Sequence, residues 1–118
     1  MIEFQILQAL SQDEEYTRQV KPFLKEGYFT QLDHKVVYRV VDEYFEKYNA
    51  LPKKEAVVID ISQRGGIDEK TIQSAIEMVE SCQPSTTDQW LVDQTETFCQ
   101  DKAIYNAIMS GIDIIEKS

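Results

Sequence analysis

The chain has 118 residues, 42% of them hydrophobic, and its 21 acidic and 12 basic residues give a formal net charge of −9. No apolar run approaches the ~20 residues that a membrane span needs, and the bases are too few and too scattered to grip a phosphate backbone. We therefore expect one domain that neither spans a membrane nor binds nucleic acid directly, and whose acidity suits a basic protein partner.

Two helices are expected at the start of the chain. The stretch 2–10 spaces its isoleucines and leucines as one helical stripe, and it lacks the basic charge and cleavage site of a signal peptide, so we expect a cytoplasmic protein. Ser11 is expected to cap a second helix, in which Pro22 either introduces a kink or starts a new turn. Gly27 ends this region.

The aromatic and valine-rich stretch 28–48 predicts a third helix with a broad apolar face. Its apolar residues recur every three or four positions, and the face consists of His34, Val37, Tyr38, Val41, Tyr44, Phe45 and Tyr48. Thr30 followed by Asp33 resembles a capping box at the start of this helix, and Asn49 is expected to end it.

Two shorter helices are expected next. Pro52 favours the first position of a fourth helix, which ends at the glycine turn 64–66. Asp68 is expected to cap a fifth helix, whose apolar side runs to Cys82. The stretch 83–88 has the composition of a loop.

The final segment, 90–118, is interrupted only by Gly111 and predicts a helix that is long for a compact domain. Trp90 opens it as either an interface anchor or a packing residue. Apolar residues recur at heptad spacing: Leu91, Phe98, Tyr105 and Ile112 in one series, Ile108 and Ile115 in another. This pattern is typical of coiled-coil-like pairing, but it also fits a long amphipathic core helix. The elements together predict an all-α fold, a compact bundle of about five to six helices with a long C-terminal helix.

No motif in the sequence predicts a catalytic or metal site. His34, the only histidine, has helical neighbours that cannot face it, so packing is a more natural role for it than catalysis. Cys82 and Cys99 lack zinc-site spacing and are expected to be buried thiols. The acids at 13–15 and 42–43 fit exposed helix faces better than a metal or glycosidase site. The phosphate-binding motifs GxxxxGK[ST] and GxGxxG are absent.

The order of these elements resembles the N-terminal domain of DnaB-type replicative helicases. That family shows a short helix, an aromatic or similar pair, a helix that opens with His-Lys, and then a proline and another short helix. The matching residues are Tyr28-Phe29, His34-Lys35, Val37-Tyr38, Tyr44 and Pro52. The downstream stretch WLVDQTETFCQDKAIYNAI looks most like the helicases of T-even bacteriophages, and the resemblance spans nearly the whole chain.

The resemblance implies that this piece is a scaffold and not a motor. Such helicases form hexameric rings, and their N-terminal domains build a collar, often a trimer of dimers, that in many members contacts the primase. ATP or GTP and Mg are used by a C-terminal RecA-like domain that is not in this chain. On this basis we expect no cofactor and no catalytic or metal-binding residue here.

The resemblance also divides the chain into a globular bundle over 1–86 and a long helix over 87–118 that begins an inter-subunit hairpin. The residues expected to pair between protomers are Phe98, Tyr105, Ile108, Ile112 and Ile115. The family's packing signature falls on Tyr28, Phe29, His34, Tyr38, Tyr44 and Pro52.

Two other functions stay open from the sequence. A stand-alone acidic adaptor, or a mimic of DNA, would bind a basic partner protein and would be complete at 118 residues. An enzyme would use His34 as its base. The helicase interpretation instead predicts that the reading frame continues past Ser118 into a domain with GxxxxGK[ST]. The sequence favours this continuation because it stops just after the apolar residues of the last predicted helix, without a glycine or other helix stop signal.

Overall fold

The computed structural model describes residues 2–84 and 87–117, with side chains described through residue 113. Every regular element in these ranges is helical, which confirms the predicted all-α class. The elements are α1 (Ile2–Gln12), α2 (Glu14–Val20), the 3-10 helices η1 (Lys21–Phe23) and η2 (Glu26–Tyr28), α3 (Leu32–Tyr48), α4 (Lys54–Gln63), α5 (Glu69–Ser81) and α6 (Gln89–Lys117).

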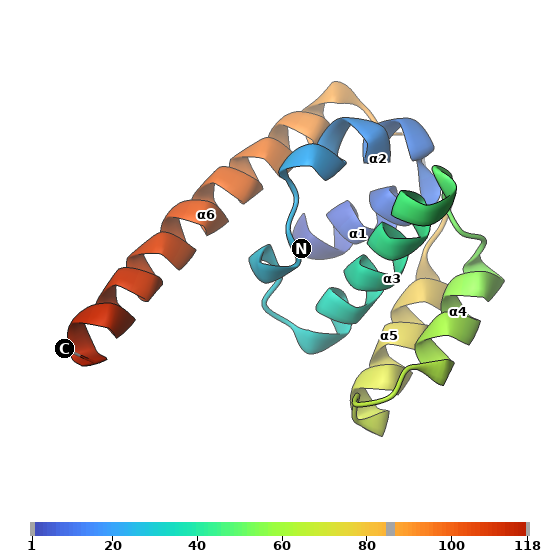
Figure 1. Cartoon of the computed structure of the whole chain (residues 1–118). Helices are drawn as coiled ribbons and strands as arrows, with labels where there is room; N and C mark the ends of the chain where they lie inside the picture. Colours follow the sequence, from blue (N-terminus) through green and yellow to red (C-terminus); the bar gives the residue numbers. More distant parts are fainter. Residues whose placement is uncertain (1, 85–86, 118) are drawn as a thin grey trace.

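Helices α1 and α3 lie at the centre of the molecule (Figure 1). Helices α4 and α5 pack side by side and both contact α3, while α2 contacts α1 and the first half of α6. Helix α6 then continues past the rest of the fold, so that its C-terminal half projects away from it (Figure 1). We call residues 103–117 the arm and the remainder of the fold the body.

Helix α3 forms the middle of the core because it is apolar around most of its circumference. The expected face is buried from His34 to Phe45 except for Tyr44, which is partly buried, and Val36 and Val40 on the adjoining side are buried too. A helix that is apolar on several sides has to be covered on several sides, here by α1, α4 and α5. Tyr48, predicted to belong to the face, is instead exposed in the last turn, where its ring lies 4.6 Å from that of Tyr44.

One buried ring joins three elements. Phe29 follows η2, and its ring centroid lies 5.3 Å from that of Tyr38 on α3 and 5.8 Å from that of Phe98 on α6. Tilted ring pairs at such distances are favourable beyond the apolar area that they bury. Phe29 therefore fixes η2 and the first half of α6 against α3.

The cap of α2 differs from the prediction. Ser11 lies inside α1, where its hydroxyl donates to the carbonyl of Leu7 at 2.9 Å. Asp13 is the N-cap, and its carboxylate accepts from the amide of Tyr16 at 3.2 Å. Both residue types cap helices well, so their local sequence does not decide between them.

Two further helix starts also differ from the sequence expectation. The predicted capping box is wrong, because Gln31 is the N-cap of α3 and Asp33 accepts from the hydroxyl of Ser74 on α5 at 2.6 Å. Helix α4 begins at Lys54, two residues after Pro52, which was expected at its first position. In contrast, Asp68 caps α5 as predicted and accepts from the amide of Thr71 at 3.1 Å.

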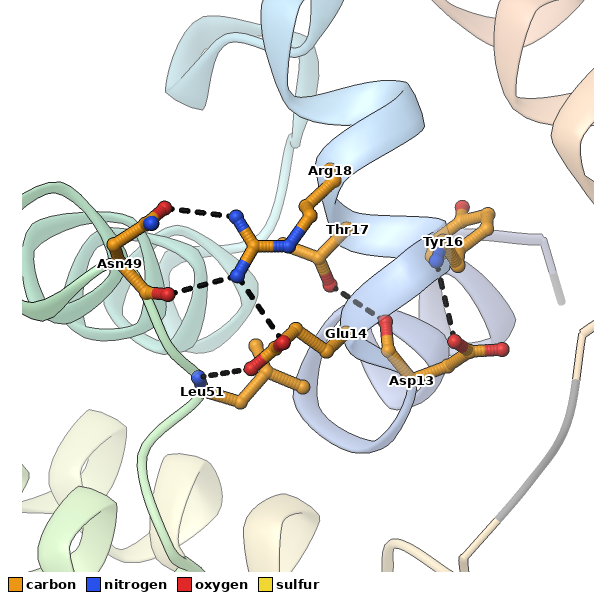
Figure 2. Close-up of polar contacts among 7 residues, drawn as sticks. All are labelled: Asp13, Glu14, Tyr16, Thr17, Arg18, Asn49 and Leu51. Atoms are coloured by element: carbon orange, nitrogen blue, oxygen red, sulfur yellow. Dashed lines mark hydrogen bonds and ion pairs between the residues drawn. The ribbon is translucent and has the colours of Figure 1, made fainter.

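The end of α3 is held by a polar cluster that Figure 2 shows. Asn49 ends the helix as predicted, in the left-handed conformation with φ 53°, which asparagine tolerates better than most residues. The Arg18 guanidinium donates to both the side-chain oxygen and the carbonyl of Asn49, each at 2.8 Å. It also pairs with Glu14 at 3.1 Å. The guanidinium group of Arg18 thus connects α2 to the C-terminal end of α3 (Figure 2).

Alkaline pH is expected to destabilise the fold through its buried tyrosines. Burial raises the pKa of Tyr16 from 10.0 to about 12, and burial also raises the pKa of Tyr38. The folded state therefore holds these protons more tightly, and stability present below pH 10 falls as the pH rises toward 12. Urea unfolding at pH 9 and pH 11.5 should show a loss of about 1–3 kcal/mol. The loss should be smaller in Tyr16→Phe, and an equal loss in that variant would contradict the assignment to Tyr16.

Candidate protein interface

The first half of α6 is seated on the body. Asp88 accepts from the amide of Leu91 at 3.2 Å and so caps the first turn. Thr95 and Cys99 are buried in the following turns. Farther along, the side-chain amide of Asn106, near the start of the arm, donates to the carbonyl of Gly27 in η2 at 3.2 Å. The rest of the arm projects away from the body (Figure 1).

The arm carries a set of large apolar side chains that the described residues do not cover. They are Ile104, 60% exposed, Tyr105, 55%, Ile108, 56%, Met109, 45%, and Ile112, 43%. Positions separated by one, four, five and eight residues lie on one side of a helix, so these five residues form a continuous row, which we call the apolar strip. A contiguous exposed apolar patch of this kind marks an interaction surface.

The structure divides the predicted pairing residues into two groups. Tyr105, Ile108 and Ile112 lie in the apolar strip. Phe98 is only 8% exposed and belongs to the chain's own core, because this part of α6 still contacts η2 and the ring of Phe29. The side chain of Ile115 lies outside the described residues. The exposed part of the predicted interface therefore begins after Phe98.

Ile104 and Met109 were missed from the predicted interface. A heptad series includes only two of every seven positions, and Ile104 and Met109 occupy positions next to it. Both residues are apolar and adjoin Tyr105 and Ile108, and this was the signal in the sequence that could have assigned them to the interface. The strip is consequently wider than a narrow coiled-coil seam.

The residues of the family packing signature lie mainly inside the body. Tyr28, Phe29, His34, Tyr38 and Pro52 are buried, and Tyr44 is partly buried. Trp90 is 58% exposed at the start of α6, beside a hollow of about 430 Å³ that it shares with Ile2. Its exposure leaves the role of interface anchor open.

His34 makes a tertiary contact that its sequence neighbours do not suggest. Its ring Nδ1 donates to the carboxylate of Glu3 on α1 at 3.1 Å, and the side chain is only 6% exposed. Asp33, the adjacent acid, binds Ser74 and not the imidazole ring. The histidine therefore joins α3 to α1 inside the body, which fits packing better than the role of a general base, since a base needs access to a substrate.

A broad hollow of about 940 Å³ lies between the α2–η2 region and α3. Four bases and four acids line it: Arg18, Lys21, Lys25 and Arg39, with Glu26, Asp42, Glu43 and Glu46. Several of these groups neutralise one another, since Arg39 binds Glu26 at 2.8 and 2.9 Å and Lys21 pairs with Asp42 and Glu46. The hollow therefore has no surplus of positive charge of the kind that binds a phosphate backbone.

The two thiols are buried as predicted. Burial raises the pKa of Cys99 to about 11 and also raises that of Cys82, so neither is poised as a thiolate nucleophile. Among the residues that the structure describes, no group of three histidine, cysteine, aspartate or glutamate side chains is placed to hold a metal ion. No described helix is long and apolar enough to cross a membrane.

Comparison with known proteins gives one informative similarity. The chain is 25% identical over 110 residues to a DnaB-like replicative helicase of Enterobacteria phage T4. No protein-family model matches the chain. The similarity supports a relationship to a replicative helicase, as expected from the sequence.

The extent of this match limits what it says about the whole protein. The aligned part makes up 92% of this chain but only 23% of the phage T4 helicase. This chain therefore spans less than a quarter of the length of that helicase.

Proposed function

We propose that this chain is the N-terminal collar domain of a hexameric replicative DNA helicase that works in the cytoplasm of a phage-infected bacterium. Its role is to bring protomers together and to offer a platform to the primase. ATP or GTP and Mg belong, on this proposal, to a C-terminal RecA-like domain of the parent polypeptide, which supplies the unwinding activity.

The observation that carries the proposal is the apolar strip on the projecting arm. A body with its own buried core does not need these side chains for folding, and exposure of five large apolar residues in one row is unfavourable in water. Burying the strip against another helix removes that cost and joins two chains. The similarity to a replicative helicase supports a helicase ring as the assembly that such a contact would serve.

Self-association of an extended chain tests the proposal. Light scattering should give a monomeric or weakly associated mass for the 118-residue piece and a larger mass for a version extended by the rest of the hairpin. In the extended version, Ile108→Glu should weaken association by at least about tenfold. Burial of an isoleucine contributes about 1.5–3 kcal/mol, and 1.4 kcal/mol corresponds to a factor of ten.

The matched control is Ile59→Glu, because Ile59 on α4 is 56% exposed, as is Ile108. This control should leave the association unchanged. Equal, monomeric masses for the short and extended chains would overturn the proposal. Equal weakening by the two substitutions would show that association does not depend on the strip.

The downstream sequence gives an independent check. The proposal requires a reading frame that continues past Ser118 into a domain with GxxxxGK[ST], and a natural stop codon there would count against it. An acidic adaptor or DNA mimic would instead compete with DNA for a basic partner protein in a binding assay.

A further inference from the structure

The direction of the arm depends on how the first turns of α6 are attached. The main contacts of α6 with the body are those with α2 and η2. The turn that begins α2, residues 13–16, supplies two polar attachments, one just before α6 and one inside it. Farther along α6, the ring contact of Phe98 with Phe29 and the Asn106–Gly27 hydrogen bond also hold the helix, so the two polar attachments act on its first turns.

Asp13 provides the first attachment. One carboxylate oxygen accepts from the amide of Tyr16 at 3.2 Å, and the other points away from it (Figure 2). This second oxygen accepts from both the amide and the hydroxyl of Thr87, at 2.9 and 2.7 Å. Burial alone would raise the pKa of Asp13, but the hydrogen bonds from Thr87 and the nearby amides lower it below its usual value. The carboxylate therefore holds Thr87 with two charge-assisted hydrogen bonds.

Tyr16 provides the second attachment. Its hydroxyl lies 2.5 Å from the hydroxyl oxygen of Thr95, which is fully buried. Because Thr95 donates its own proton to the carbonyl of Leu91 at 2.7 Å, Tyr16 is the donor in the pair. Thr87 lies two residues before α6, and Thr95 lies in its second turn. The two attachments therefore hold the start of α6 at two separate points.

We propose that Asp13 is a positioning residue that sets the direction in which α6 leaves the body, and with it the placement of the arm. This inference rests on the proposed function only for the use of the arm in self-association. Asp68, the N-cap of α5, is an ordinary cap and shows by comparison what is unusual about Asp13. Its two carboxylate oxygens bind the amide and hydroxyl of Thr71, within the same helix, at 3.1 and 2.6 Å, and hold no second element.

Asp13→Ser separates the two roles of Asp13. Serine is a strong N-cap, so the bond to the Tyr16 amide is kept, but its single oxygen leaves Thr87 without an acceptor. Hydrogen exchange of the Thr87 amide should then accelerate roughly 10- to 100-fold, the range for losing a hydrogen bond to a charged group. The matched control is Asp68→Ser, which changes a cap of the same chemistry and should leave this amide unchanged.

The position of the arm is measured by distances between spin labels on Glu55→Cys in α4 and Ala107→Cys in the arm, both at exposed positions. The native thiols are buried and should remain unlabelled. At concentrations where the chain is monomeric, Asp13→Ser and Thr87→Val should broaden the distance distribution. Thr87→Ser, which keeps both donors, and Asp68→Ser should match the parent.

Unchanged distances in Asp13→Ser would overturn the inference, because packing alone would then fix α6. Equal broadening in Asp68→Ser would also overturn it, since the effect would be general loosening of the fold. These distances are intramolecular. A chain that passes this test yet never associates contradicts only the proposed function, and an associating chain with unchanged distances contradicts only the role of Asp13.

Discussion

Phe29→Ala is expected to lower the free energy of unfolding by about 3–5 kcal/mol, the usual cost of truncating a buried phenylalanine. The ring is fully buried and contacts rings on α3 and α6, so its removal leaves a cavity where three elements meet. Small domains are stable by only about 5–15 kcal/mol, so a large part of the total would be lost. Urea unfolding followed by circular dichroism measures the change.

Leu32→Ala is the control for this substitution. Leu32 is a large apolar residue close to Phe29 in the sequence, but it is exposed, and its truncation should change stability by no more than about 0.5 kcal/mol. If Phe29→Ala lowered the free energy of unfolding as little as Leu32→Ala, the rings of Phe29, Tyr38 and Phe98 could not form the centre of the core.

Phe98→Ala then distinguishes a core residue from an interface residue. A core role predicts a loss of stability that is the same at every protein concentration, whereas an interface role predicts a loss that depends on concentration. The rings of Phe29 and Phe98 are in contact, so the double variant should lose less than the sum of the single losses.

The helices of the body were predictable because their signals are local. The apolar spacing of α3, the helix end at Asn49 and the cap at Asp68 depend on residues a few positions apart. The structure confirms the end and the cap, and it confirms the apolar face up to Phe45 but not at Tyr48. The all-α class follows from the same short-range patterns.

The errors in the helix starts have a common physical cause. Ser11 and Asp13 are equally good caps by local rules, and the partner of the second carboxylate oxygen of Asp13 is Thr87, 74 positions away. One carboxylate oxygen of Asp33 likewise accepts from Ser74, 41 positions away, while the other accepts from the adjacent amide of His34. A pattern of neighbouring residues contains no information about such partners.

The candidate interface was predicted in part for a related reason. Phe98 and Tyr105 occupy equivalent positions of the heptad, yet one is buried and the other is exposed. Periodicity identifies a face of α6, but it does not show where along the helix the body ends. Tertiary packing determines that point, because Phe29 covers Phe98 and the Asn106–Gly27 hydrogen bond to η2 lies near the start of the arm.

The pair formed by His34 and Glu3 is expected to contribute measurably to stability. The imidazole Nδ1 and the carboxylate are 3.1 Å apart, and the side chains are only 6% and 12% exposed. Glu3→Ala leaves a buried polar ring without its partner, which should cost about 1–3 kcal/mol in urea unfolding. His34→Ala should cost at least as much, because it also leaves a cavity.

A double-mutant cycle with Glu3→Ala and His34→Ala isolates the interaction, and a coupling of roughly 0.5–3 kcal/mol is expected for groups in direct contact. The Glu26–Arg39 pair is the control, since both side chains are partly exposed and such pairs contribute only about 0–1 kcal/mol. A coupling no larger than that of the control would show that His34 is not a structural partner of Glu3. The catalytic hypothesis makes a different prediction, in which His34→Gln abolishes turnover while stability is kept. We instead expect His34→Gln to lower the free energy of unfolding measurably, because the amide of glutamine only partly replaces the imidazole between α1 and α3.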